Sequence, residues 1–262
     1  MSVPLLEVEG VSRSFGGVHA LQGMSLSVAE GESAALIGPN GSGKSTLVNV
    51  VTRMVDAEAG AVRVGGVDVT RARKHRVAAH GIARTFQHVR LIPELTLREN
   101  AAVGAIHRDL GTVRGTVRSF LSGRLGKADR AVAEQALDLM EVPASVRDRN
   151  PDAVPFALQR QTEIARALSA SPRLVLLDEP AAGMNPAEVA MLLRLLRAVN
   201  AAGIATLLIE HNMEFVMQAA DRITVINRGT RIAHGTAQEV RRDPAVVEAY
   251  LGARRAGGEE SA

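Results

Sequence analysis

Residues 38–46 of this chain read Gly38-Pro39-Asn40-Gly41-Ser42-Gly43-Lys44-Ser45-Thr46. They match G-x-x-x-x-G-K-[ST], the pattern of a phosphate-binding P-loop. The apolar run before them, 34–37, predicts a buried strand, and the run after them, 47–51, predicts a helix. Glycines let backbone N–H groups approach an anion closely, and the start of a helix favours negative charge. The stretch therefore predicts a phosphate site in preference to a simple glycine-rich turn.

The residues of this loop are expected to bind a nucleotide in different ways. Backbone N–H groups would hold its phosphates, the Lys44 ammonium would add a positive charge there, and the Ser45 hydroxyl would coordinate Mg²⁺. The residues expected to contact the nucleotide at this loop are Asn40, Gly41, Ser42, Gly43, Lys44, Ser45 and Thr46.

Composition narrows the class of protein. Of the 262 residues, 46% are apolar and 23% are charged, the ordinary mixture of a globular protein. There is no cysteine, which excludes disulfide bonds and thiolate metal sites. The first residues lack the features of a signal peptide, and no run approaches the roughly 18 apolar residues of a membrane span. Because 31 basic residues face 28 acidic ones and aromatic residues make up only 2%, we expect no nucleic acid partner.

The segments on both sides of the P-loop read as short strands. The alternation of residues 5–11, a second strand at 24–28 and a hairpin with a glycine pair at 62–67 predict a small antiparallel sheet. Phe15 follows the first of these strands. Its ring is either a platform for the nucleobase or an ordinary apolar side chain at a strand end.

Polar side chains follow two further predicted strands. Strand 81–87 ends at Gln87, and strand 174–178 ends in Asp178 and is followed by Glu179. Ligands of open α/β sheets bind at the carboxyl ends of strands, so Gln87 could meet the metal or the attacking water, although its spacing alone marks only a polar loop residue. We expect Asp178 to hold Mg²⁺ and Glu179 to polarise the water, the alternative being two surface acids that cap a turn.

The stretch between these two strands is helical in character. Residues 131–140 and 159–168 carry the clearest helical patterns. Residues 108–127 are rich in Gly, Ser and Arg, which predicts a long exposed segment. We therefore expect residues 88–168 to form a helical subdomain inserted into the sheet domain.

The last part of the chain continues the α/β pattern. The sequence Asn-Pro-Ala-Glu at residues 185–188 predicts a helix start, and the apolar strand 204–209 leads to His211. This order places His211 at the same expected sheet edge as the P-loop lysine, where it would contact the γ-phosphate, although a lone histidine is more often structural. Residues 223–233 predict a last hairpin.

Taken in this order, the motifs resemble those of the ATP-binding subunits of ABC transporters, over nearly the whole chain. The series consists of the aromatic Phe15, the Walker A loop 38–46, the Q-loop Gln87, the Walker B strand 174–178 with Glu179, the D-loop 181–185 and the switch residue His211. The resemblance implies ATP and Mg²⁺ as cofactors. It also implies metal contacts at Ser45, Gln87 and Asp178, and catalytic roles for Glu179, His211 and Gln87.

The fold that this resemblance implies is α/β. It is a P-loop NTPase core of the RecA-like type with an antiparallel β subdomain and an inserted α-helical subdomain. We expect one ABC ATPase domain, with residues 1–87 and 169–252 as the nucleotide-binding core, residues 88–168 as the helical subdomain and residues 253–262 as a flexible tail.

Three stretches look like the branched-chain amino acid uptake group of that superfamily, the LivG type. They are residues 81–87, 178–186 and 247–252. That resemblance implies pairing with a LivF-like ATPase or with a second copy, two membrane permeases, a periplasmic or surface-anchored binding protein, and a peripheral place at the cytoplasmic face of the inner (plasma) membrane. Importers of urea and of other amides or carboxylates share much of this pattern and lipopolysaccharide-export ATPases share some of it, so the solute rests on analogy.

The ABC signature departs from the family pattern. The family has L-S-G-G-Q or, in this group, often L-P-Y-G-Q, where residues 154–158 of this chain read Val-Pro-Phe-Ala-Leu. Pro155 has neither a hydroxyl nor an N–H group, Ala157 adds a methyl group, and Leu158 cannot form a side-chain hydrogen bond. We expect a weak signature, so that the chain's own Walker residues work with the signature of a partner.

The mechanism expected is ATP-driven closure of a pair of ATPase subunits, which drives the permeases. Two other functions stay open. One is a regulatory nucleotide-binding half with weak turnover, which the poor signature suggests. The other is a soluble ABC ATPase that acts on DNA or ribosomes, although such proteins usually carry two cassettes or a long coiled coil.

Overall fold

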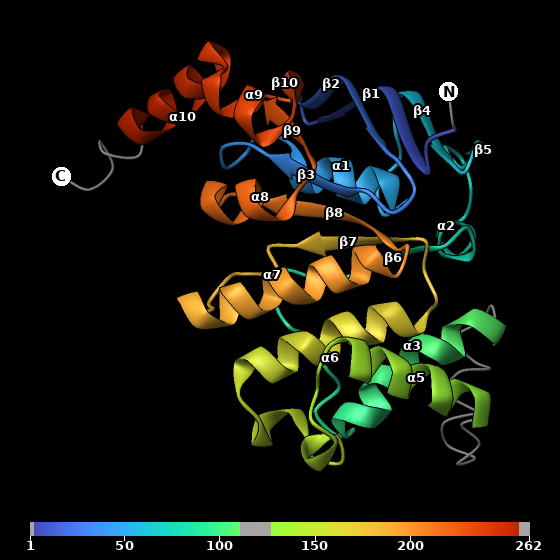
Figure 1. The fold of residues 1–262 in the computed structure, drawn as a ribbon. Coiled ribbons are helices and arrows are strands. Elements are labelled where there is room, and N and C mark those ends of the chain that lie inside the picture. The colour runs from blue at the N-terminus through green and yellow to red at the C-terminus, as the bar shows by residue number, and fades with distance from the viewer. Residues whose placement is uncertain (1–2, 111–126, 257–262) are drawn as a thin grey trace. The chain divides into compact units, whose positions relative to one another are not determined.

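The computed structural model describes residues 3–110 and 127–256 of the chain. It consists of two compact units, one formed by Met1–His80 with Ala205–Ala262 and the other by Gly81–Ile204 (Figure 1). Each unit is described by itself below. The exposed segment expected at 108–127 lies almost entirely outside the described residues.

The first unit contains the antiparallel sheet that the sequence predicts. Its strands are β1 (Leu6–Phe15), β2 (Val18–Val28), β4 (Ala59–Val64) and β5 (Val67–Asp68). They lie in the order β2-β1-β4-β5. The turns of both hairpins are glycine pairs with positive φ, Gly16-Gly17 and Gly65-Gly66. The second strand is longer than the expected 24–28, because its first residues pair with the end of β1.

A second sheet of the same unit leads into the P-loop. Its strands are β3 (Ser33–Ile37), β8 (Ala205–Glu210), β9 (Arg222–Asn227) and β10 (Thr230–Gly235). Strand β3 lies between β8 and β9 and runs parallel to both, and every residue of β3 is buried. A strand covered on both faces needs apolar side chains throughout, which is why β3 reads as one apolar run.

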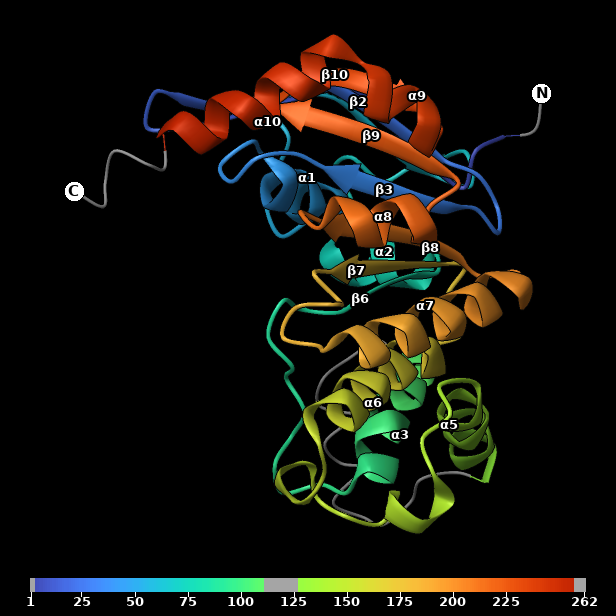
Figure 2. The same ribbon diagram turned by 60° about the vertical axis from the view of Figure 1, so that its left-hand side comes forward.

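The helices of the first unit are α1 (Lys44–Val51), α2 (Lys74–Ala79), α8 (Met213–Ala219), α9 (Ala237–Arg242) and α10 (Pro244–Ala256). Helices α9 and α10 pack against β10, as Figure 2 shows. Helix α10 continues to Ala256, into the tail expected to be flexible from residue 253, and residues 257–262 lie outside the described part. Among the described residues, no helix combines the length and the apolar character that a membrane crossing requires.

The second unit contains two short parallel strands and the predicted group of helices. The strands are β6 (Ile82–Arg84) and β7 (Leu174–Asp178). The helices are α3 (Leu97–Leu110), α5 (Lys127–Leu139), α6 (Phe156–Ser169) and α7 (Pro186–Ala201), with 3₁₀ turns η1 (Ala144–Val146) and η2 (Pro151–Ala153). Helices α3, α5 and α6 pack against one another (Figure 2), and the compact unit that contains them extends from Gly81 to Ile204, beyond the expected bounds 88–168.

Two local features of the second unit follow directly from its sequence. Helix α7 begins with a capping box, in which the Asn185 side chain accepts from the Glu188 N–H at 3.0 Å and the Glu188 carboxylate accepts from the Asn185 N–H at 2.9 Å. Helices α3 and α6 touch at Gly104, where a Cβ would lie 1.9 Å from the Arg166 carbonyl oxygen. Only glycine allows the two helix backbones to approach this closely.

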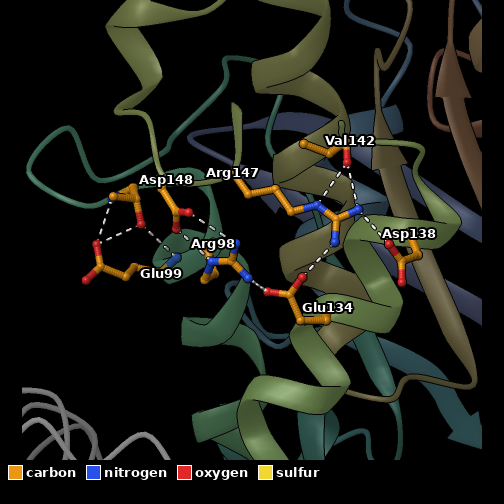
Figure 3. A network of polar contacts seen from close by, with 8 residues as sticks. Arg98, Glu99, Glu134, Asp138, Val142, Arg147 and Asp148 are labelled. Atoms are coloured by element: carbon orange, nitrogen blue, oxygen red, sulfur yellow. Dashed lines mark hydrogen bonds and ion pairs between the residues drawn. The ribbon is translucent and has the colours of Figure 1, made fainter. Parts of the chain in front are cut away.

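A network of hydrogen bonds and ion pairs links helices α3 and α5 to the segment after η1 (Figure 3). Arg98 of α3 and Arg147, which follows η1, both bind the Glu134 carboxylate of α5. Arg147 also donates to Asp138 at 2.6 Å and twice to the Val142 carbonyl oxygen, at 2.7 and 2.9 Å. The network therefore joins α3, α5 and the segment that leads to α6.

Candidate functional site

The P-loop runs from the buried strand β3 to α1, as predicted. Its course requires glycine at both ends: a Cβ at Gly38 would lie 2.0 Å from a backbone carbonyl oxygen of β9, and a Cβ at Gly43 would lie 2.4 Å from the Ala20 carbonyl oxygen. Gly43 also has a φ of 109°, which L side chains rarely adopt. The Gly229 N–H donates to the Ser42 carbonyl at 2.9 Å. Strand β2 and the β9–β10 turn thus hold the loop from two sides.

The loop and the start of α1 form a cationic cradle. The N-cap of α1 is Gly43, which has no side chain to cap the first turn, and the N-terminus of a helix favours an anion. Lys44 is buried, and its ammonium donates to the carbonyl oxygens of Gly38 at 2.7 Å and Pro39 at 2.9 Å. Ser45 is exposed in the first turn. This arrangement suits a phosphate group.

One side of the P-loop faces helix α10. Asn40 and Gly41 line a cavity of about 550 Å³ together with the β9–β10 turn and α10 residues such as Glu248. Tyr250 of the same helix is largely buried, and burial raises the pKa of its hydroxyl to about 12, although the Gly38 backbone acts in the other direction. The C-terminal helix therefore belongs to the surroundings of the loop, which sequence reasoning did not predict.

His211 lies at the same sheet edge as the P-loop. In the parallel pair β3 and β8, Ile37 is level with Glu210, so Gly38 and His211 both follow at the carboxyl ends of their strands. The buried Glu210 carboxylate accepts from the His211 N–H at 3.1 Å and shapes this turn. The imidazole itself is 57% exposed, so it can reach a ligand.

Phe15 lies at the end of β1, and its side chain is 45% exposed. The Arg13 guanidinium lies 4.7 Å from the centre of its ring. This cation–π contact covers one face of the ring and restricts its orientation.

In the second unit, Asp178 ends the buried strand β7 and is itself buried. The Arg84 guanidinium of β6 binds one of its carboxylate oxygens at 3.0 Å. The Asp178 N–H is 3.4 Å from the Thr85 hydroxyl. The cost of burying this carboxylate is thus offset by a cation, which sequence reasoning did not identify.

Glu179 and Gln87 meet in this unit. The Gln87 side-chain amide donates to a Glu179 carboxylate oxygen at 2.9 Å. Glu179 has a φ of 46°, a strained conformation for a residue with a side chain, which directs the chain sharply away from β7. Strand β6 ends at Arg84, so Gln87 lies in the loop that follows and not at the end of the expected strand 81–87, and from there it contacts Glu179 directly.

The expected Mg²⁺ ligands supply a suitable donor set. A hydroxyl from Ser45, an amide oxygen from Gln87 and a carboxylate from Asp178 are the oxygen ligands that this hard cation prefers. In the described residues there is no cluster of three or more acidic, His or Cys side chains that could hold a metal by itself.

The expected signature lies at the start of α6. Pro155 is the N-cap residue, Phe156 is the first helical residue and is 41% exposed, and Ala157 is buried. The Gln159 side chain donates back to the Val154 carbonyl at 3.1 Å. The helix start is therefore formed, but it carries neither the hydroxyl nor the glycine that the family pattern has.

Comparison with known proteins agrees with these motifs. The ABC transporter family matches residues 21–182, and the family described as branched-chain amino acid ATP-binding cassette transporter matches residues 230–256. The chain is 38% identical to the high-affinity branched-chain amino acid transport ATP-binding protein BraF of Pseudomonas aeruginosa over 260 residues, 96% of this chain and 99% of that protein. It is 39% identical to the high-affinity branched-chain amino acid transport ATP-binding protein LivG of Salmonella typhimurium over 258 residues, 96% of this chain and 99% of that protein.

Solved structures show the same architecture. A nucleotide-free ATP-binding cassette from an ABC transporter has a TM-score of 0.84 and 31% identity, covering 95% of this chain and 99% of that one. An ATP-binding cassette in its ADP conformation has a TM-score of 0.84 and 32% identity, covering 96% and 100%. The expected α/β fold with an antiparallel β subdomain and a helical subdomain is confirmed.

Proposed function

Because the chain belongs to the family of ABC transporter ATP-binding proteins, in its branched-chain amino acid group, we propose that its ATP hydrolysis drives the uptake of branched-chain amino acids or of related small amides and carboxylates. The observation that carries this proposal is the similarity to BraF and LivG, which extends over nearly the full length of all three chains. The solute is assigned by this similarity, because the ATPase subunit does not touch it.

Nucleotide binding is assigned to the first unit. The backbone N–H groups of residues 40–46 and the Lys44 ammonium would hold the phosphates, and Phe15 would stack on the base. The buried position of Lys44 supports this role, because a charge is kept in such a place only where it has partners.

Hydrolysis is assigned to the residues that the family motifs mark. Glu179 would polarise the attacking water, and the contact with the Gln87 amide supports this role because it fixes the orientation of the carboxylate. His211 would contact the γ-phosphate. Ser45, Gln87 and Asp178 would hold Mg²⁺, which when bound neutralises charge on the phosphates. Most of the rate would come from positioning and charge stabilisation.

The partners follow from the family. We propose a second ATPase subunit of the LivF type, or a second copy of this chain, together with two membrane permeases and, indirectly, a binding protein. The chain would lie peripherally at the cytoplasmic face of the inner membrane. Residues 154–158 favour the heterodimer, because a copy of this chain would supply only its poor signature.

An uptake experiment tests the proposal. Cells that lack this chain should lose uptake of radiolabelled leucine, regain it with the wild-type chain, and not regain it with Glu179→Gln. Glu214→Gln, a change at an exposed acid in the first turn of α8, is the matched control and should restore uptake. Undiminished leucine uptake in the deleted cells, with loss of uptake of a different solute, would contradict the assigned substrate.

A second candidate function rests on the signature. With Val-Pro-Phe-Ala-Leu at residues 154–158, the chain could serve as a regulatory half that binds ATP and turns it over weakly. The presence of Glu179 and His211 argues against this regulatory function, because a purely regulatory subunit needs neither residue. Turnover by the assembled pair after Glu179→Gln in this chain alone separates the two: a large loss supports hydrolysis here, and an unchanged rate supports regulation.

A further inference from the structure

One face of helix α6 carries charged residues that are withdrawn from solvent. Arg160, Glu163 and Arg166 are spaced by three residues and so lie along one strip of the helix. The side chains of Arg160 and Glu163 are each 1% exposed. Charged residues are almost never buried this deeply without partners. The partners of this strip are backbone groups of residues 86–90, the segment that contains Gln87.

Arg160 binds the carbonyl oxygens of the two peptide groups on either side of Gln87. Its Nη1 donates to the Phe86 carbonyl oxygen at 3.0 Å, and its Nη2 donates to the Gln87 carbonyl oxygen at 2.9 Å. Nη1 also donates to the Glu163 carboxylate at 2.9 Å. The planar fork of a guanidinium donates to these acceptors from two separate nitrogens in a fixed geometry, whereas an ammonium donates from a single nitrogen.

The rest of the strip fixes the end of the same segment. The Glu163 carboxylate accepts from the Arg90 N–H at 3.2 Å, and Arg166 donates to the Arg90 carbonyl at 2.6 Å. Burial raises the pKa of the Glu163 carboxyl, although the Arg90 N–H and two guanidinium groups act in the opposite direction. Helix α6 therefore binds residues 86–90 through their backbone, independently of the side chains there.

The geometry points to Arg160 as a positioning residue that acts through Gln87 on Glu179. With its backbone held by Arg160, Gln87 extends its amide to the Glu179 carboxylate at 2.9 Å. The start of the same helix is the signature, so a displacement of α6 would reach Glu179 through two hydrogen-bonded links. This inference rests on the proposed catalytic role of Glu179.

The choice of variant matters, because Arg160 has a second role. Replacing it with methionine would leave the buried Glu163 carboxylate without its nearest cation, which is strongly destabilising. Arg160→Lys keeps a cation near Glu163 but gives up the fork that binds two carbonyl groups. Arg194→Lys is the matched control, because Arg194 also binds a carboxylate, on Glu141, but lies 60% exposed in α7.

A fluorescent reporter tests the positioning without any turnover. The chain has no tryptophan, and Phe86 is 38% exposed, so Phe86→Trp places a single indole next to Gln87. Arg160→Lys in this background should lower the anisotropy of the indole and increase its quenching by acrylamide, while Arg194→Lys should change neither. Unchanged anisotropy and quenching in Arg160→Lys would overturn the inference, whether or not the chain hydrolyses ATP.

Kinetics of the assembled complex test the link to catalysis. Arg160→Lys should lower kcat by about 10- to 100-fold through misplacement of the reacting groups and leave KM for ATP unchanged, because the P-loop is untouched. In a Gln87→Ala background the same change should have no further effect on kcat. An equal loss of kcat in both backgrounds, or a changed KM with constant kcat, would contradict action through Gln87.

Discussion

Replacing Arg147 with methionine should destabilise the helical part of the chain far more than replacing the exposed Arg194 of α7. Arg147 lies at the centre of the network in Figure 3, and its side chain is only 8% exposed. It donates to Glu134, to Asp138 and twice to the Val142 carbonyl. Methionine fills much of the same space but offers no donor.

The size of the effect follows from what each partner loses. Val142 is 1% exposed, so its carbonyl would be left without these side-chain donors at a cost of about 1–3 kcal/mol. Asp138 is 68% exposed and can turn to water, and Glu134 keeps its ion pair with Arg98, so these two losses cost about 1 kcal/mol together. We expect Arg147→Met to lower the free energy of unfolding by about 2–4 kcal/mol.

Urea unfolding followed by far-ultraviolet circular dichroism measures this change. With a denaturant slope of about 2 kcal/mol per molar urea, the midpoint should fall by about 1–2 M. The control is Arg194→Met, which removes an ion pair between side chains that are 60% and 48% exposed. That loss should cost less than about 1 kcal/mol.

Equal midpoints for the two variants would refute the reasoning, because they would mean that burial of the Val142 carbonyl does not decide the energy. A larger effect of Arg194→Met would refute it as well. Arg147→Lys adds a graded test: an ammonium can replace some of the donors, so its midpoint should lie between those of Arg147→Met and the wild-type chain.

Three further predictions concern the P-loop, pH and the signature. Gly43→Ala would force a methyl group to within 2.4 Å of the Ala20 carbonyl oxygen, so it should lower ATP affinity at least about 10-fold in a titration with a fluorescent ATP analogue; unchanged affinity would show that the loop does not need this course. Burial and two nearby arginines lower the pKa of His234, so the unfolded chain binds a proton there first as the pH falls. The thermal stability of the wild-type chain should therefore drop from pH 7.5 to 5.5, and it should drop less in His234→Gln. An equal drop in the variant and the wild-type chain would contradict this reasoning. Ala157→Gly with Leu158→Gln should raise turnover of the heterodimer, and an unaltered rate would argue against a weak signature.

Much of the fold could be predicted because its main elements carry strong local signals. Strand β7 has the predicted bounds, 174–178, because a strand buried on both faces is a continuous apolar run. The start of α7 could be predicted from its capping residues. Helix α9 has the same kind of signal, with Thr236 and Glu239 forming a capping box, but its six residues carry too short an apolar pattern to be noticed.

The candidate site could be predicted only as far as strand ends reveal it. Asp178 and Glu179 can be predicted as candidates because two acids at the end of a buried strand are expensive without a cation, and Gln87 can be predicted only from its place after a strand. Their partner Arg84 was not found, since its contact with Asp178 depends on the register of β6 against β7. Arg160 could not be predicted either, because its partners are backbone carbonyl groups 73 and 74 residues away, and such contacts leave no pattern in the sequence.

The most direct measurement of the central claim is the steady-state ATPase rate of the purified chain against its own concentration, with Glu179→Gln as the blank. We expect the chain alone to match the blank at every concentration, because its own weak signature completes a site poorly. Addition of the second ATPase subunit should then produce turnover that Glu179→Gln abolishes. A rate per chain that rises with concentration without a partner, and vanishes in the blank, would contradict the claim that a partner must supply the signature.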